Sequence, residues 1–262
     1  MVSFAQWLGL REAADGAARD RGLVERVRGV VGRTPVIHDL GSGTGSMGRW
    51  LAPRLGGAQR WIMYDRDPEL LERAAAGMAG VTGADGAPVA VQTRCADITT
   101  LTPADLAGAA LVTCSALLDM LTAADVDAVV AACADRPALF TLSVVGEITL
   151  TPADPLDAEI GAAFNAHQRR AALLGPDAAD AAAEAFRRRG ATVHTRATPW
   201  RLGPDQAALA AEWLRGWVGA AVEQRPDLAG RAAAYSERRL AESTSGDLSV
   251  TVGHKDLLAN AG

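Results

Sequence analysis

The sequence predicts an α/β protein built on a doubly wound, mostly parallel sheet of about seven strands, with helical insertions. Two observations predict this fold. Short apolar runs alternate with helix-like stretches between residues 36 and 145, and the first apolar run ends in a glycine-rich loop. Strands separated by helices imply a parallel sheet with helices on both faces. The length of 262 residues fits one domain.

The apolar spacing places each element in order. Strands are expected at 36–40, 61–64, 89–94, 109–113, 138–145, 191–198 and 248–252, and helices within 4–31 and at 44–55, 68–79, 123–134, 177–189, 205–222 and 227–242. We therefore expect a single domain over 1–262. It would carry an N-terminal helical segment (1–33), a candidate lid insert (147–176) with a short amphipathic piece at 157–174, and a second helical insert (205–242).

Composition excludes several classes of protein. The net charge is −5 and the densest basic run is Arg187–Arg189 near a predicted helix end, so nucleic acid is not an expected partner. The three cysteines lack the spacing of a metal site, which predicts no metal and a reducing, cytoplasmic setting. No run of about 18 apolar residues and no signal-peptide pattern is present, so no membrane association is expected.

The glycine-rich loop Asp39-Leu40-Gly41-Ser42-Gly43-Thr44-Gly45 follows the first predicted strand and opens a helix. Glycines allow positive φ angles and let a ligand approach the backbone closely. Doubly wound sheets bind ligands at this position, beyond the carboxyl ends of their strands. The loop is therefore the predicted cofactor site.

Two cofactor classes use such a loop. Gly43–Gly48 matches the GxGxxG pattern of dinucleotide-binding folds, but the match starts two residues after Gly41, which displaces the tight turn from the strand end. The carboxylate of Asp39 would also repel a pyrophosphate. S-adenosylmethionine carries an ammonium and a sulfonium and no phosphate, so an acidic loop suits it better.

Acidic residues also follow the next two strands. Asp65 lies 20 positions beyond Gly45 and is placed to accept both ribose hydroxyls of an adenosine. Asp97 follows the third strand and can accept from the adenine amine, while Ile98 covers the ring. Three acids after three successive strand ends are a more specific signal than any one of them.

These segments resemble the cofactor motifs of class I S-adenosylmethionine-dependent methyltransferases. Val36–Gly45 resembles the first motif, and Trp61–Asp67, Ala96–Ile98 and Leu111–Asp119 resemble the later ones in order. The resemblance covers roughly residues 34–150. It implies a Rossmann-like sheet of seven strands with an antiparallel last strand, and methyl transfer with release of S-adenosylhomocysteine. The cofactor contacts it implies fall on Asp39, Gly41, Ser42, Gly43, Gly45, Asp65, Arg66, Asp97, Ile98 and Ser115.

The loop after the fourth strand lies beside the reactive methyl in that family, which makes Asp119 a candidate base or acceptor clamp. Asp119 could instead belong to the N-cap region of the following helix. His167, in the lid insert beside Phe164, is the second catalytic candidate, with packing as its alternative role. The family's Asn/Asp-Pro-Pro-aromatic motif for base methylation is replaced by Ser115–Leu118. The expected acceptor is therefore a small molecule, methylated on oxygen, nitrogen or carbon.

Two other functions stay open. An NAD(P)-dependent oxidoreductase is disfavoured by Asp39, by the glycine register, and by the lack of a Tyr-x-x-x-Lys pair, since Lys255 is the only lysine. A non-catalytic methyltransferase-like domain that binds the cofactor would carry the same loop. Turnover of an acceptor separates this function from catalysis.

Overall fold

A computed structural model describes residues 2–133 and 135–260. The strands are β1 (Val36–Leu40), β2 (Gln59–Asp65), β3 (Val89–Cys95), β4 (Leu111–Ser115), β5 (Ala138–Thr151), β6 (Thr192–Ala197), β7 (Trp200–Leu202) and β8 (Ser249–Asn260). The helices are α1 (Phe4–Ala18), α2 (Arg21–Arg28), α3 (Ser46–Leu51), α4 (Pro68–Met78), α5 (Ala123–Cys133), α6 (Asp157–Gln168), α7 (Ala178–Arg188), α8 (Ala207–Gln224) and α9 (Ala229–Ser245).

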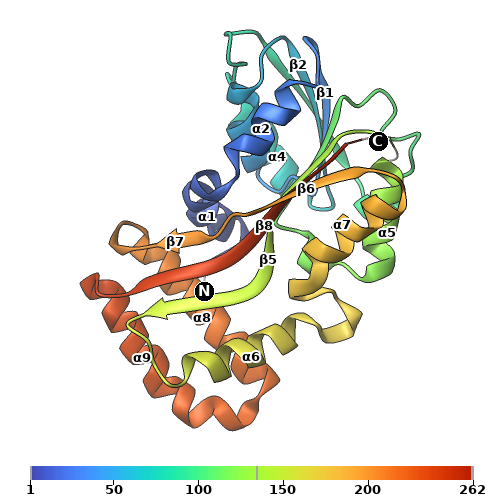
Figure 1. The fold of residues 1–262 in the computed structure, drawn as a ribbon. Helices are drawn as coiled ribbons and strands as arrows, with labels where there is room; N and C mark the ends of the chain where they lie inside the picture. Colours follow the sequence, from blue (N-terminus) through green and yellow to red (C-terminus); the bar gives the residue numbers. More distant parts are fainter. Residues whose placement is uncertain (1, 134, 261–262) are drawn as a thin grey trace.

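The strands form one sheet in the order β3-β2-β1-β4-β5-β8-β6, and the short β7 pairs with β8. The neighbours from β3 to β5 are parallel, whereas β8 runs antiparallel to both β5 and β6. The predicted doubly wound sheet with an antiparallel last strand is confirmed (Figure 1). The observed sheet has eight strands because β7 adds a short edge strand.

Two apolar layers cover the faces of the sheet. One layer is formed by α2, α3 and α4 and includes Leu23, Trp50 and Met78. The other layer is formed by α5 and α7 and includes Val129 and Phe186. Local signals start these helices: the side chain of Asp67 accepts from the first turn of α4, and Pro68 stands at its first position. The strands β1, β2 and β4 are buried along almost their whole length and lie between the two layers, as expected for central parallel strands.

A third apolar cluster lies outside the sheet layers. It joins α6, α8 and α9 to β7 and to the outer ends of β5 and β8, with Trp213 and Trp217 stacked 5.1 Å apart between ring centroids. Figure 1 shows these helices gathered at one end of the molecule, below the long strands β5 and β8. No helix among the described residues is long and apolar enough to cross a membrane.

The last strand is longer than predicted. The apolar pattern indicated only 248–252, but β8 continues through the polar run Gly253–Asp256 to Asn260. Asp256 is buried because it accepts from the backbone N–H groups of Asp20 and Leu142 and from the Thr198 hydroxyl. Hydrogen bonds from distant segments offset the burial of this carboxylate, and no local pattern shows them.

Candidate functional site

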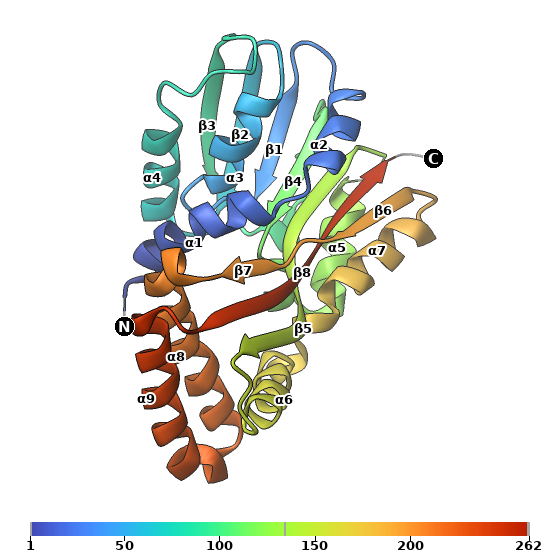
Figure 2. The ribbon, with the colours of Figure 1, turned by 60° about the vertical axis from the view of Figure 1, so that its left-hand side comes forward.

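A cavity of about 1020 Å³ lies at the carboxyl ends of β1, β2, β3 and β4. Its volume is at the upper end of the range for small-molecule sites. Figure 2 shows α1 crossing below the ends of these strands, so that the helix forms one wall. The remaining walls come from the loops after β1 to β4, and the predicted cofactor residues that line the cavity are Asp39, Gly41, Ser42, Gly43, Asp65, Arg66, Asp97, Ile98 and Ser115.

The loop after β1 needs its glycines. Gly41 has φ +65°, and a Cβ there would lie 2.3 Å from Cδ2 of Leu117. Gly45 has φ +83° and immediately precedes α3; it supports the turn without lining the cavity. The backbone N–H of Gly43 donates to Oδ2 of Asp65 at 2.8 Å. The end of β2 therefore holds the loop open around the cavity.

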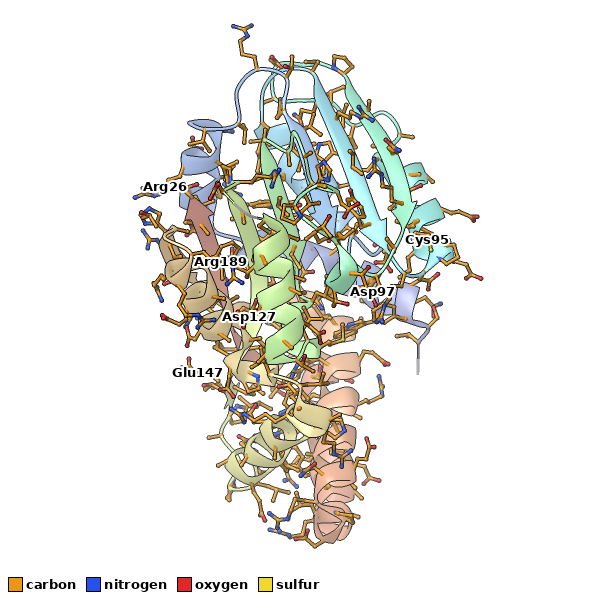
Figure 3. All side chains as sticks on the ribbon, turned by 90° about the vertical axis from the view of Figure 1, so that its right-hand side faces the viewer. Arg26, Cys95, Asp97, Asp127, Glu147 and Arg189 are labelled. Carbon is orange, nitrogen blue, oxygen red and sulfur yellow. The ribbon has the colours of Figure 1, made fainter. Side chains whose placement is uncertain are left out.

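Asp65 and Asp97 lie at neighbouring strand ends. The second carboxylate oxygen of Asp65 accepts from the N–H of Asp67 at 3.0 Å, so backbone donors fix the orientation of this carboxylate. Asp97 accepts from both the N–H and the hydroxyl of Thr99, and these bonds hold its pKa below the ordinary range. Nη1 of Arg66 lies 3.9 Å from Oδ2 of Asp97, and the Arg66 side chain is largely exposed. Figure 3 shows Asp97 near Cys95, just beyond the end of β3.

Asp39 is the most buried acid of the cavity wall, at 1% exposure. Its Oδ1 accepts from the Thr113 hydroxyl at 2.7 Å, whereas Oδ2 has no partner among the described residues. Burial raises the pKa of Asp39 to about 7. A buried carboxylate oxygen without a donor indicates a site that a ligand donor or cation would complete.

A family model described as a methyltransferase domain matches residues 37–136. Residues 37–136 are therefore similar to a methyltransferase domain. The match runs from β1 through α5 and so includes each strand end that lines the cavity. No curated protein matches the chain.

Solved structures show a similar fold. A SAM-dependent methyltransferase from Geobacter sulfurreducens, in complex with S-adenosyl-L-homocysteine, is 16% identical with a TM-score of 0.50, and the match covers 100% of both chains. A cyclopropane synthase from Mycobacterium tuberculosis is 14% identical (91% of this chain, 83% of that chain, TM-score 0.48). A geranyl diphosphate C-methyltransferase from Streptomyces coelicolor is 10% identical (92% and 80%, TM-score 0.46). The first of these supports the methyltransferase fold assigned to this chain.

Asp119 lines the same cavity, in the short turn after β4. Burial raises the pKa of its carboxyl group. The alternative role in the N-cap region of α5 is wrong, because Thr122 precedes that helix and its hydroxyl accepts from the N–H of Asp125 at 3.2 Å. The Asp119 side chain makes no hydrogen bond or ion pair with another residue of the described chain, so its carboxylate is available to a ligand.

The structure does not bring His167 to the wall of the cavity. Its Nε2 lies 2.9 Å from Oε2 of Glu223 on α8, and Phe164 packs against the third apolar cluster. The segment 164–169 is absent from the cavity wall within the described residues. A catalytic or lid role for His167 stays a prediction, and the geometry gives it no support.

The wall that the sequence analysis missed is α1. Phe4, Trp7, Leu8, Arg11 and Asp15 line the cavity. Their spacing of three or four residues puts them on one helix face, and this was the available signal. Apolar residues at that spacing also describe an ordinary packed helix, so the pattern alone did not separate a ligand wall from a core face.

Proposed function

We propose that this protein transfers the methyl group of S-adenosylmethionine to a small-molecule acceptor and releases S-adenosylhomocysteine. The observation that carries the proposal is that Asp39, Asp65 and Asp97, from three separate strand ends, line one cavity together with the glycine loop. The match to a methyltransferase domain over the same segment supports it.

The acidic groups of the cavity are complementary to the positive charges of the cofactor. Oδ2 of Asp39 lacks a partner in the described chain, and an ammonium would supply one. Asp65, held by backbone donors, would accept the ribose hydroxyls, and Asp97 with Ile98 would meet the adenine. A dinucleotide would bring its pyrophosphate to the same loop, where the buried Asp39 carboxylate repels it. The proposal therefore excludes NAD(P).

The acceptor would occupy the part of the cavity between α1 and the turn after β4. Apolar side chains dominate there: Phe4, Trp7 and Leu8 on one side, Leu117 and Met120 on the other. Phe4 is 58% exposed and Met120 51%, which is unusual for large apolar side chains unless a ligand or partner covers them. We therefore expect an acceptor with an apolar body.

The charge of the cavity wall narrows the class of acceptor that we expect. Seven aspartates and two arginines line the cavity, and Arg11 is already paired with Asp15 at 3.0 Å. An acceptor that is neutral or cationic would enter this negative field at lower cost than an anion such as a phosphate ester or a free carboxylate.

Asp119 would act on the acceptor. The bound cofactor supplies a methyl group on a positively charged sulfur, which needs no further activation. What the chain supplies is alignment of the acceptor atom and, when that atom carries a proton, a base to receive it. Asp119 has a raised pKa and a free carboxylate, which suits it to accept that proton.

Deuteriomethyl-labelled S-adenosylmethionine and a library of small amines, phenols and alcohols would test the function. We expect the mass of at least one acceptor to rise by one labelled methyl group, with an equal amount of S-adenosylhomocysteine formed. The Asp65→Ala variant would serve as the binding-deficient control. Tight cofactor binding with no transfer across an acceptor library, and none in extracts of the source cell, would instead support a non-catalytic cofactor-binding domain.

A further inference from the structure

A second hollow lies between α2 and the short turn Ala52–Arg54 that follows α3. Its volume of about 420 Å³ is within the range of small-molecule sites. Figure 2 shows α2 beside the sheet toward the amino ends of β1 and β4, whereas α1 crosses below their carboxyl ends. The residues that line the hollow are all different from those that line the cofactor cavity; they are Arg21, Val24, Glu25, Arg28, Pro53 and Arg54.

Three arginines surround this hollow. Arg21 and Arg28 are almost two helical turns apart on one face of α2, and Arg54 faces them from the turn. The one acid in the lining is Glu25, whose Oε1 lies 2.6 Å from Nη1 of Arg28 and whose side chain is 63% exposed. Neither Arg21 nor Arg54 forms an ion pair within the described part of the chain. The hollow therefore has an excess of two positive charges, although the net charge of the chain is −5.

Two of these arginines are held in place by their neighbours. The guanidinium of Arg54 lies over the Trp50 ring, with Cζ 4.6 Å from the ring centroid, and donates to the backbone carbonyl of Trp50. Nε of Arg28 donates to the carbonyl oxygen of Arg54 at 2.5 Å, which ties α2 to the turn. Burial and the nearby charges of Arg21 and Arg28 lower the pKa of Arg54. The fold thus holds like charges together, and a bound anion would reduce their repulsion.

We propose that this hollow binds the phosphate group of a small organic phosphate, with Arg21, Arg28 and Arg54 contacting the phosphate oxygens. A guanidinium remains charged at neutral pH and presents its N–H donors in a planar fork that matches two phosphate oxygens. A phosphate dianion also balances two excess positive charges better than a single carboxylate does. Val24 and Pro53 line the same hollow and offer apolar surface to the organic part. This site is additional to the proposed methyl transfer and does not depend on it.

Nuclear magnetic resonance titrations of the isotope-labelled wild-type protein test the site directly. The probes are inorganic phosphate, phenyl phosphate and phenol, each added at constant ionic strength set with sodium chloride. We expect both phosphates to shift the amide signals of 21–28 and 52–54 until they saturate, with phenyl phosphate effective at the lower concentration, and phenol to leave these signals unchanged. Shifts that do not saturate, or that are spread over the whole surface, would overturn the proposal. So would retention of the protein on phosphatidic acid vesicles without any response to the soluble phosphates.

Three variants test the residues with the same phenyl phosphate titration. Arg54→Gln should weaken binding about tenfold or more, the effect of losing a charge-assisted hydrogen bond. Arg21→Gln should weaken it several-fold, and because Arg21 is exposed this variant keeps the test valid if Arg54→Gln fails to fold. Arg26→Gln is the matched control: it removes the same charge from α2, but Arg26 is exposed and lies outside the hollow (Figure 3). The control should bind like the wild type. Equal weakening in all three variants would show general charge attraction and would overturn the proposal.

Discussion

Asp39 offers a substitution whose effects on stability and on binding have opposite signs. In Asp39→Asn the remaining oxygen keeps its hydrogen bond from the Thr113 hydroxyl, and an amide replaces the unpartnered Oδ2. The variant cannot ionise. We expect it to be more stable than the wild type in the absence of cofactor above pH 7, and to bind cofactor less tightly.

The magnitude follows from the pKa. Burial raises the pKa of Asp39 from 3.8 to about 7. Between these two values the folded protein holds a proton that the unfolded chain has lost, so stability falls as pH rises from about 4 to about 7 and is level above that. At 1.36 kcal/mol per unit, the loss is about 4 kcal/mol. The new amide leaves a buried donor without an acceptor, which costs roughly 1–3 kcal/mol. The net gain of Asp39→Asn at pH 8 is therefore roughly 1–3 kcal/mol.

Urea unfolding of both proteins at pH 5 and pH 8 measures this difference, and subtracting the two proteins removes the groups they share. The stability gain of the variant should be larger at pH 8 than at pH 5. Calorimetry at pH 8 should show cofactor affinity reduced at least about tenfold. A variant with the same pH dependence as the wild type and unchanged affinity would refute the assignment of Asp39 as a buried, ligand-directed acid.

Three further substitutions test the remaining site residues. Asp65→Ala should weaken S-adenosylhomocysteine binding by about 1.5–3 kcal/mol and lower the melting temperature somewhat, because it also removes the acceptor for the N–H groups of Gly43 and Asp67; an unchanged dissociation constant would make Asp65 a solvated strand-end acid. Asp119→Asn should cut methyl transfer while leaving S-adenosylhomocysteine affinity nearly intact, and full activity would remove it as the base. His167→Ala should leave transfer and cofactor affinity close to wild type, because His167 pairs with Glu223 outside the cavity; a large loss of transfer at normal stability would restore its catalytic role.

The residues expected to bind the cofactor could be predicted from the sequence, because each of them lies at the end of a strand that its own neighbours in the sequence reveal. Asp39, the glycines after it, Asp65 and Asp97 each stand at a strand end, and parallel strands bring those ends to one edge of the sheet. Alternating apolar runs were enough to place the strands. The three acids therefore line one cavity as expected.

The residues around the expected acceptor position are brought together by contacts between distant segments. The sequence therefore predicted fewer of them correctly. Phe164 and His167 had the composition of a lid, but α6 belongs to the third apolar cluster and packs away from the cavity. The burial of Arg19 at the end of α1 had no local signal, because the hydroxyls that its guanidinium contacts belong to Ser46 and Ser115, 27 and 96 positions away. The second half of β8 was not predicted either, because the polar residues around Asp256 are buried through hydrogen bonds from distant segments.

The identity of the cofactor is the central claim, and calorimetry with S-adenosylhomocysteine and NADH on the wild-type protein tests it most directly. The buried Asp39 carboxylate and the three acids of the cavity predict that S-adenosylhomocysteine binds and that NADH gives no measurable heat at the same concentrations. Tight binding of NADH, with none of S-adenosylhomocysteine, would contradict the account.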